Sequence, residues 1–253
     1  MIIKAYYLEF WRIAMLTFDL HRINLSSEAP NILDLGCGEG RHVFGCMTVF
    51  NNANIIGIDM HEESLEKCVE GNIFFKGHNN CNNLFSQASI YQLPFKEKSF
   101  DLIICSEVME HLDDYKKAMK IIHSLLKDDG TLLISVPSYF PEKICWLLSN
   151  EYQNMPGGHV RIFTKSTLIK DLGCSGFSVI SSKRFHAFHS PYWWLRCLFW
   201  RTQEDNFLVK AYKKFLEYQI LNETAILDFI EKIFNPLLGK SISLALSKNE
   251  TNK

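Results

Sequence analysis

Ile32-Leu33-Asp34-Leu35-Gly36-Cys37-Gly38-Glu39-Gly40-Arg41-His42 is the stretch that decides the fold of this chain. A mostly apolar run gives way at once to three glycines and then to a helix-like segment. This order indicates a buried strand, a tight turn and the start of a helix. Glycine allows the backbone to adopt positive φ and to approach a ligand closely. The first amides of a helix lack partners and carry partial positive charge, so the turn suits a nucleotide-like molecule with a negative end.

The spacing of the glycines indicates which nucleotide. A dinucleotide site has G-x-G-x-x-G, whereas Gly36, Gly38 and Gly40 form G-x-G-x-G, with Asp34 two residues before the first glycine. A carboxylate at that point would repel a pyrophosphate and attract an ammonium group. S-adenosylmethionine has an ammonium, a carboxylate and a sulfonium, and no phosphate. The stretch resembles the first motif of class I S-adenosylmethionine-dependent methyltransferases; the alternative is a plain glycine turn in an unrelated α/β domain.

Composition excludes several classes of protein. The chain has 253 residues, 47% hydrophobic and 22% charged, which is typical of a globular domain with elaborations. A net charge of −1 disfavours a nucleic-acid partner. Eight cysteines without a C-x-x-C pair predict the reduced thiols of a cytoplasmic protein. The first residues lack the uninterrupted apolar core of a signal peptide, and no uncharged apolar run reaches the roughly 18 residues that span a bilayer.

Apolar runs alternate with helical patterns along most of the chain. Strands are expected at residues 32–35, 54–60, 84–88, 99–105, 131–137, 176–181 and 240–247. Helices are expected at 2–20, 39–50, 61–71, 113–127 and 164–172, with a long excursion over 138–160 and mostly helical structure over 188–234. This alternation predicts an α/β fold, a Rossmann-like seven-stranded, mostly parallel sheet with helices on both faces.

The same pattern divides the chain into four parts. An N-terminal helix occupies residues 1–25 and an S-adenosylmethionine-binding core occupies 26–186. A helical aromatic insertion at 187–238 precedes a final sheet strand at 239–248. In open parallel sheets ligands bind beyond the carboxyl ends of the strands. An acceptor is therefore expected above residues 105–111, under a lid made from residues 138–160 and 188–234.

Asp59 ends the second expected strand, 23 residues after Gly36. An acid at this position can accept hydrogen bonds from ribose hydroxyls; the alternative is a helix N-cap. Met60 would lie beside the adenine. The stretch from Ser89 and Ile90 to Phe95 resembles the family's loop that contacts adenine, with Ser89 where an acid is expected, so adenine binding would rest more on backbone amides and on Ile90.

Taken together, the resemblance implies ten cofactor-binding residues. They are Asp34, Gly36, Cys37, Gly38, Gly40, Asp59, Met60, Ser89, Ile90 and Cys105.

Glu107-Val108-Met109-Glu110-His111 follows the fourth expected strand, where the methyl group should be presented. In a helical turn Glu107 would share a face with Glu110 and His111, and the Gly157–Thr164 segment could fold His159 toward them. E-x-x-E-H with a later His resembles the metal sites of small-RNA and quinone-biosynthesis methyltransferases, although the spacing beyond His111 differs from the small-RNA enzymes. This resemblance implies a divalent cation that holds a hydroxyl acceptor and lowers its pKa.

Two alternatives stay open for this cluster. In the first, His111 or His159 acts as a general base beside Glu107, without a metal. In the second, Glu107 and Glu110 are acids near a helix N-terminus and His111 is structural.

The resemblance covers roughly residues 31–183 and the final strand, and it is strongest to the quinone-biosynthesis and small-molecule O-methyltransferase branch. It implies methyl transfer from S-adenosylmethionine to a small-molecule or lipid-like acceptor, at oxygen. The alternatives are an N- or C-methyltransferase and a partner subunit that binds the cofactor without transferring a methyl group. An NAD dehydrogenase is disfavoured by the glycine spacing.

The segment from Phe185 to Arg201 is rich in aromatic residues. Between Leu172 and Gln203 the chain has four bases and no acid. Trp, Tyr and bases favour the headgroup zone of an anionic membrane, which predicts a peripheral membrane contact through this segment. The alternative is a lid helix whose aromatic rings line the acceptor pocket.

Overall fold

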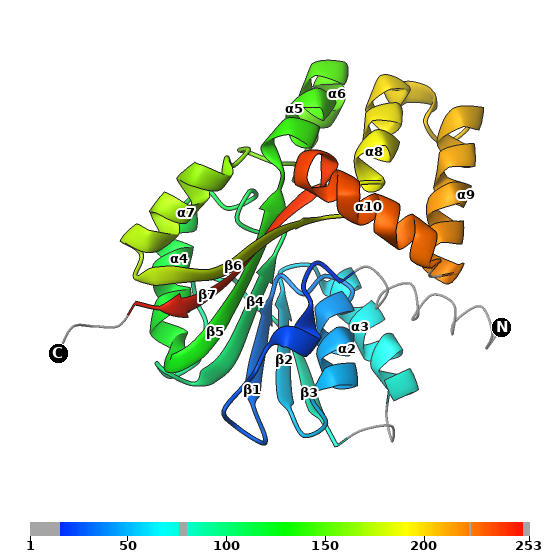
Figure 1. Ribbon diagram of the computed structural model, residues 1–253. Coiled ribbons are helices and arrows are strands. Elements are labelled where there is room, and N and C mark those ends of the chain that lie inside the picture. The colour runs from blue at the N-terminus through cyan, green and yellow to red at the C-terminus, as the bar shows by residue number, and fades with distance from the viewer. Residues whose placement is uncertain (1–15, 76–79, 223, 250–253) are drawn as a thin grey trace.

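The computed structural model describes residues 16–75, 80–222 and 224–249, and within them seven strands form one sheet (Figure 1). The strand order is β3-β2-β1-β4-β5-β7-β6. The first five strands pair in parallel, and β7 runs antiparallel to both β5 and β6. The bounds are β1 Asn31–Leu35, β2 Asn54–Asp59, β3 Asn82–Gln87, β4 Phe100–Ser106, β5 Leu126–Pro137, β6 Phe177–Phe185 and β7 Ser241–Lys248. The predicted Rossmann-like, mostly parallel sheet is confirmed.

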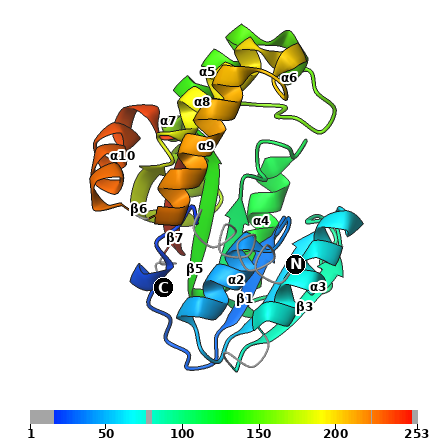
Figure 2. The same cartoon turned by 90° about the vertical axis from the view of Figure 1, so that its right-hand side faces the viewer.

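Helices cover both faces of this sheet (Figures 1 and 2). Helices α2 (Arg41–Val49) and α3 (Glu62–Phe75) cover one face, and α4 (Tyr115–Leu125) and α7 (Lys165–Cys174) cover the other. Successive strand residues point to opposite faces, so Leu102 and Ile104 pack toward α2 while Ile103 and Cys105 pack toward α4. Burial on both faces explains why these strands are continuous apolar runs.

Five further helices lie beyond the carboxyl ends of β4 and β5 (Figures 1 and 2). They are α5 (Tyr139–Leu148), α6 (Asn150–Gln153), α8 (His189–Leu198), α9 (Phe207–Asn222) and α10 (Ala225–Leu238), which together form the lid. Helix α5 packs on α8, and α8 on α9. The lid has its own small core, made of Cys145, Tyr152 and Cys197 with the rings of Trp146, Trp193, Trp194 and Trp200.

Several element boundaries differ from expectation. The predicted N-terminal helix lies mostly outside the described residues; residues 16–19 are irregular and lead into a 3-10 turn, η1 (Leu20–Arg22). The excursion expected at 138–160 contains two helices, α5 and α6. Pro141 does not prevent α5, because it occupies the first helical turn, where proline is tolerated. A second 3-10 turn, η2 (Trp200–Thr202), follows α8. None of the helices described is long and apolar enough to cross a membrane.

Candidate active site

The loop between β1 and α2 places the three motif glycines in the left-handed region, with φ of 70° at Gly36, 53° at Gly38 and 87° at Gly40. These glycines have different surroundings. A Cβ at Gly36 would lie 2.3 Å from Cγ2 of Val108, whereas a Cβ at Gly38 would meet nothing within 4 Å. Gly36 therefore lets the loop pack against the segment after β4, and Gly38 leaves a surface that a ligand can approach.

Asp34 lies in β1 beneath this loop and is almost completely buried. Neither of its carboxyl oxygens has a hydrogen-bond partner among the described residues. Burial raises the pKa of Asp34 to about 7, although the Arg41 guanidinium opposes the shift. A buried acceptor without a donor is unfavourable, and the ammonium group of S-adenosylmethionine would supply both donors and charge. The residues present fit that cofactor.

Asp59 joins the end of β2 to the glycine loop. Its Oδ2 accepts a hydrogen bond from the Gly38 N–H at 2.8 Å, and its Oδ1 accepts one from the His61 N–H at 2.9 Å. The amide of Cys37 donates to the Ile58 carbonyl at 2.9 Å, so the loop is fixed to β2 by its backbone as well. The structure therefore brings Asp34, the glycines and Asp59 together at neighbouring strand ends.

The other predicted cofactor-binding residues have a less direct relation to the glycine loop. Met60 follows Asp59, and its side chain is 62% exposed. Ser89 Oγ accepts from the Tyr91 N–H at 3.3 Å, and Ile90 packs into the core. Cys105 is fully buried in β4 on the face covered by α4. The thiol of Cys105 is thus part of the core and does not face the glycine loop.

A cavity of about 360 Å³ lies between the carboxyl end of β4 and the lid. It begins beside the glycine loop, at the first residue of α2. Its walls combine charged, imidazole and aromatic side chains. They come from Thr17, Arg41, Glu107, His111, Tyr152, Met155, Gly157, Gly158, His159, His186, His189, Trp193, Lys240 and Ser241.

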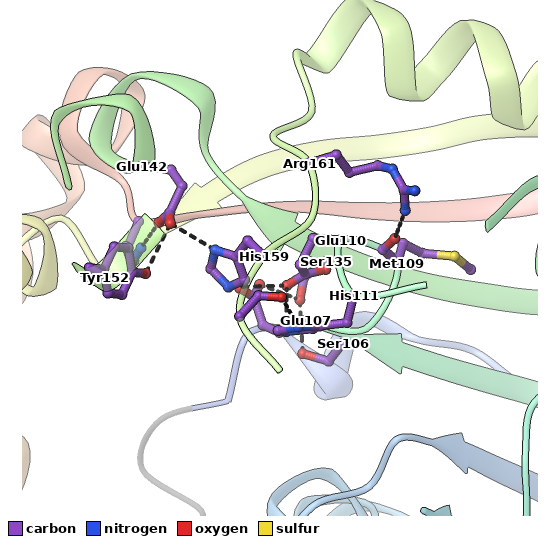
Figure 3. Close-up of polar contacts among 12 residues, drawn as sticks. Ser106, Glu107, Met109, Glu110, His111, Ser135, Glu142, Tyr152, His159 and Arg161 are labelled. Atoms are coloured by element: carbon purple, nitrogen blue, oxygen red, sulfur yellow. Dashed lines mark hydrogen bonds and ion pairs between the residues drawn. The ribbon is translucent and has the colours of Figure 1, made fainter. Parts of the chain in front are cut away.

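Glu107 directly follows β4 and has a φ of 56°, a left-handed conformation that is rare outside glycine. The backbone leaves the strand in a bend here, so Glu107 does not begin a helical turn and does not share a helix face with Glu110 and His111. The Glu107 carboxylate accepts from Ser135 Oγ at 2.9 Å. Because Ser135 has one hydroxyl proton, Ser106 Oγ, at 2.8 Å, must donate to Ser135 (Figure 3). Glu107 is thereby oriented by a short chain of hydroxyl groups.

Glu110, His111 and His159 converge on one space, as Figure 3 shows. Glu110 is fully buried, and neither carboxyl oxygen has a hydrogen-bond partner among the described residues. Nε2 of His111 lies 3.9 Å and Nε2 of His159 lies 4.0 Å from Glu110 Oε1. One ligand atom from each of the three side chains lies within 4.8 Å of the others. Three of the four predicted metal-ligand residues are therefore together, and Glu107 is turned toward Ser135.

The outer nitrogens of both imidazoles are held by acceptors. His159 Nδ1 lies 2.7 Å from Glu142 Oε1, and His111 Nδ1 lies 3.1 Å from the Gly158 carbonyl oxygen. A carbonyl or carboxylate oxygen only accepts, so each Nδ1 carries the hydrogen, and in the neutral form of each imidazole Nε2 presents a lone pair toward Glu110. Burial and His159 lower the pKa of His111, while burial and Glu107 raise that of Glu110. This space, surrounded by acceptors, suits a cation or the proton of a hydroxyl group.

Glu142, which no pattern in the sequence singled out, organises the lid side of the site. Glu142 accepts from Lys240 Nζ at 2.5 Å and from the Tyr152 hydroxyl at 2.9 Å, besides its contact with His159. Burial alone would raise its pKa, but His159 and Lys240 lower it to about 2. The available signal was an acid next to Pro141 at a helix start, in a segment that was expected to be irregular.

The aromatic segment from Phe185 to Arg201 packs inside the lid. Trp194 Nε1 donates to the Pro141 carbonyl at 3.0 Å, and the rings of Trp193 and Tyr152 are 5.9 Å apart. Trp193 also lines the cavity. The rings of this segment pack mainly within the lid, as expected of a lid helix, and Trp193 places one ring in the cavity wall.

Known proteins resemble this chain in sequence and in fold. An uncharacterised protein of Methanocaldococcus jannaschii is 32% identical over 151 residues, 60% of this chain and 56% of that protein. The malonyl-[acyl-carrier protein] O-methyltransferase of Halalkalibacterium halodurans is 31% identical over 120 residues, 46% of this chain and 42% of that enzyme. The crystal structure of YcgJ from Bacillus subtilis superposes with a TM-score of 0.56 at 19% identity, over 96% of this chain and 99% of that one.

The aligned region spans about half the length of the curated relatives. Residues 26–198, more than half of the chain, match the family model described as a methyltransferase domain. This match includes the glycine loop, Asp59 and the Glu110 cluster. The chain therefore belongs to the class I S-adenosylmethionine-dependent methyltransferase family.

Proposed function

We propose that this protein transfers a methyl group from S-adenosylmethionine to an oxygen atom of a small-molecule or lipid-like acceptor. The observation that supports this most is the space between Glu110, His111 and His159, where two imidazole nitrogens face a carboxyl group that has no hydrogen-bond partner among the described residues. When bound, S-adenosylmethionine supplies a methyl group that its sulfonium makes electrophilic. The protein must then hold a nucleophile in line and take up its proton.

The cofactor contacts follow from the glycine loop. Asp34 would pair with the ammonium group, and Asp59 would accept from ribose hydroxyls through lone pairs not used by the Gly38 and His61 amides. Gly38 gives the cofactor room to approach the backbone. Met60, Ser89 and Ile90 would border the adenine.

The acceptor would lie in the cavity beneath the lid. Trp193 and Tyr152 form part of its wall, and this apolar surface would exclude water from the reacting groups. The volume of about 360 Å³ suits a small molecule or one segment of a lipid-like chain. The net charge of −1 gives no support to a nucleic-acid acceptor.

The arrangement of the two imidazoles suits the removal of a proton from the acceptor. Glu142 holds the Nδ1–H of His159, and the Gly158 carbonyl holds that of His111, so either Nε2 can accept the proton of an acceptor hydroxyl. Methyl transfer to a hydroxyl group needs such a base, whereas transfer to an unprotonated amine does not, which favours oxygen over nitrogen as the methylated atom. A positioned base contributes about 10²–10⁴-fold to the rate.

A divalent cation is the second candidate for the same space. Glu110, His111 and His159 supply one carboxylate and two imidazoles, a donor set that binds divalent metals. Their Nδ1 partners, Glu142 and Gly158, would fix the ring orientations, as outer partners of metal ligands do. The cation would hold the acceptor hydroxyl and lower its pKa.

The test uses the purified protein with methyl-deuterated S-adenosylmethionine and a metabolite and lipid extract. Mass spectrometry would detect products that gain the labelled methyl group. Isothermal titration with S-adenosylmethionine, its demethylated product and NAD separates a methyltransferase from a dehydrogenase. Cofactor binding without any labelled product from a broad extract would favour the non-catalytic partner subunit.

Once an acceptor is known, two comparisons separate the base from the cation. Full activity in EDTA excludes the metal. Full activity in both His111→Ala and His159→Ala excludes the base.

Peripheral membrane contact through Phe185 to Arg201 stays a prediction. Leu198 and Arg201 are exposed in this segment, but most of its rings pack within the lid. Co-sedimentation with anionic vesicles at low salt measures the contact, with Leu198→Glu as the variant. No sedimentation of the unaltered protein would contradict it.

A further inference from the structure

A second cluster of metal-binding side chains lies where the sheet meets the lid. His186 directly follows β6, His189 is the first residue of α8, and Glu231 lies on α10. One ligand atom from each of these residues lies within 4.8 Å of the others, and the two imidazole rings are 5.3 Å apart. None of the three belongs to the Glu110 cluster, although His186 and His189 line another wall of the same cavity.

Both imidazoles have an unused ring nitrogen. His186 Nε2 and His189 Nδ1 are buried and have no hydrogen-bond partner among the described residues. Buried polar atoms are normally paired, so two unpaired nitrogens beside one carboxylate call for an explanation. The lone pair of a neutral imidazole nitrogen is a common metal ligand. His186 also has a φ of 65°, a strained conformation that sets the position of its ring.

Glu231 is held in place by two neighbours. The Phe188 N–H donates to Oε1 at 3.4 Å, and Gln219 Nε2 donates to Oε2 at 3.2 Å. These donors leave a free lone pair on each carboxylate oxygen. Outer contacts of this kind orient metal-ligating carboxylates.

Two positive charges lie near this cluster. Lys240 forms an ion pair with Glu142 at 2.5 Å. Burial lowers the pKa of both imidazoles, and the Arg41 guanidinium lowers it further. Glu231 supplies the negative charge within the cluster that would offset a bound cation.

We propose that His186, His189 and Glu231 form a binding site for one divalent transition-metal ion that ties the junction of β6 and α8 to α10. Two imidazole nitrogens and one carboxylate are the donor set of zinc sites that keep an open coordination position. Because two of the ligands line the cavity, that position would face the space assigned to the acceptor. The proposal does not depend on methyl transfer and adds a second function to the lid.

The test must separate this site from the Glu110 cluster. In a His111→Ala/His159→Ala background, metal-stripped protein is titrated with Co²⁺ and then with Zn²⁺. We expect one equivalent of Co²⁺ with visible ligand-field bands, no thiolate charge-transfer band, and displacement by Zn²⁺. Adding His186→Ala, His189→Ala or Glu231→Gln should weaken binding at least tenfold, whereas His61→Ala, at an exposed imidazole, should leave it unchanged.

Zn²⁺ should also raise the unfolding temperature of the background protein and not that of the three variants, because a ligand that binds only the folded state stabilises it. Glu231→Gln keeps the shape of the side chain and serves if a histidine variant does not fold. Equal Co²⁺ binding in Glu231→Gln and in the folded histidine variants would overturn the proposal, as would no binding in the background protein. Isothermal titration of the same proteins with S-adenosylmethionine reports separately on the proposed function.

Discussion

At the scale of single residues, the site depends on carboxyl groups in unlike surroundings. Glu142 is buried with three hydrogen-bond partners, whereas the carboxyl oxygens of Asp34 and Glu110 have no hydrogen-bond partner among the described residues. The first arrangement stabilises the folded protein, and the second keeps an unsatisfied group where a ligand can use it.

Glu142→Gln should destabilise the protein by about 3 kcal/mol, because it leaves Lys240, whose side chain is only 13% exposed, without its ion partner. The free energy of unfolding in urea measures the loss. Glu142→Gln/Lys240→Met, which removes both charges, should recover a substantial part of it. A loss of the same size in the double variant would contradict the importance of the pair.

Asp34→Asn should stabilise the ligand-free protein more at high pH than at low pH. The folded-state pKa of Asp34 is about 7, above its ordinary value of 3.8. The ionised form of Asp34 is therefore disfavoured in the folded protein, and the free energy of unfolding falls as pH rises from about 4 to about 7. We expect a gain about 2–3 kcal/mol larger at pH 8 than at pH 5, together with weaker binding of S-adenosylmethionine. A pH-independent gain in urea unfolding would argue against this raised pKa.

Alanine at Gly36 and at Gly38 should have different effects. Both positions have positive φ, which costs a non-glycine residue about 1–2 kcal/mol. At Gly36 the added carbon also meets Val108, so we expect the larger loss of stability there. At Gly38 the new methyl group occupies open space, so cofactor affinity should fall more than stability. Thermal unfolding and isothermal titration of both variants decide this, and equal losses of stability would contradict the packing difference.

At the scale of elements, most of the sheet could be predicted because its parallel strands are buried on both faces and read as apolar runs. The start of β3 could not be predicted in this way. Asn31, Asn54 and Asn82 are in register on neighbouring strands, and their side-chain amides form a ladder with bonds of 3.1 Å. Asparagine disfavours strands by itself, and only the pairing of distant segments offsets this preference.

The start of β5 was missed for a related reason. Leu126 pairs with Phe100, and a register shift accommodates the residues up to Thr131. The Asp-Asp-Gly sequence within this shift is typical of a helix end or turn, which was the prediction. Strand pairing between distant segments again overrides the local preference.

Helix α7 shows the opposite case, in which a local signal was sufficient. The helix expected at residues 164–172 is confirmed, and Thr164 caps it, because its Oγ1 accepts from the Thr167 N–H at 3.2 Å. Thr164→Ala should cost about 1 kcal/mol of folding free energy, and Thr164→Ser should cost much less. Urea unfolding of both variants provides the measurement. Equal losses would mean that the threonine methyl group, rather than the cap, matters.

At the scale of the whole molecule, some residues of the site could be identified from the sequence and others could not. The glycine loop, Asp59, Glu110 and His111 lie close to strand ends, so the strand pattern located them. Glu142, on the lid, and Lys240, at the start of the last strand, are 98 residues apart and meet only in the folded protein. Residue type and spacing do not indicate such a contact.

Cofactor binding should be visible in the stability of the whole chain. S-adenosylmethionine at a hundred times its dissociation constant should add about 2.7 kcal/mol, which corresponds to a rise of roughly 5–10 °C in the unfolding temperature. Asp59→Ala should weaken binding by about 1–3 kcal/mol and reduce the rise at the same concentration. Differential scanning calorimetry measures both. An undiminished rise in Asp59→Ala would remove Asp59 from the cofactor site.

The position of β7 between β5 and β6 has a consequence for synthesis on the ribosome. Strand β6 ends at Phe185 and its sheet partner β7 begins at Ser241, 56 residues later. At about 5–20 residues per second, the nascent β6 waits roughly 3–11 seconds for the strand that joins it to the sheet. During that interval its backbone groups are open to other chains. The order of translation thus leaves β6 without its sheet partner until β7 has emerged.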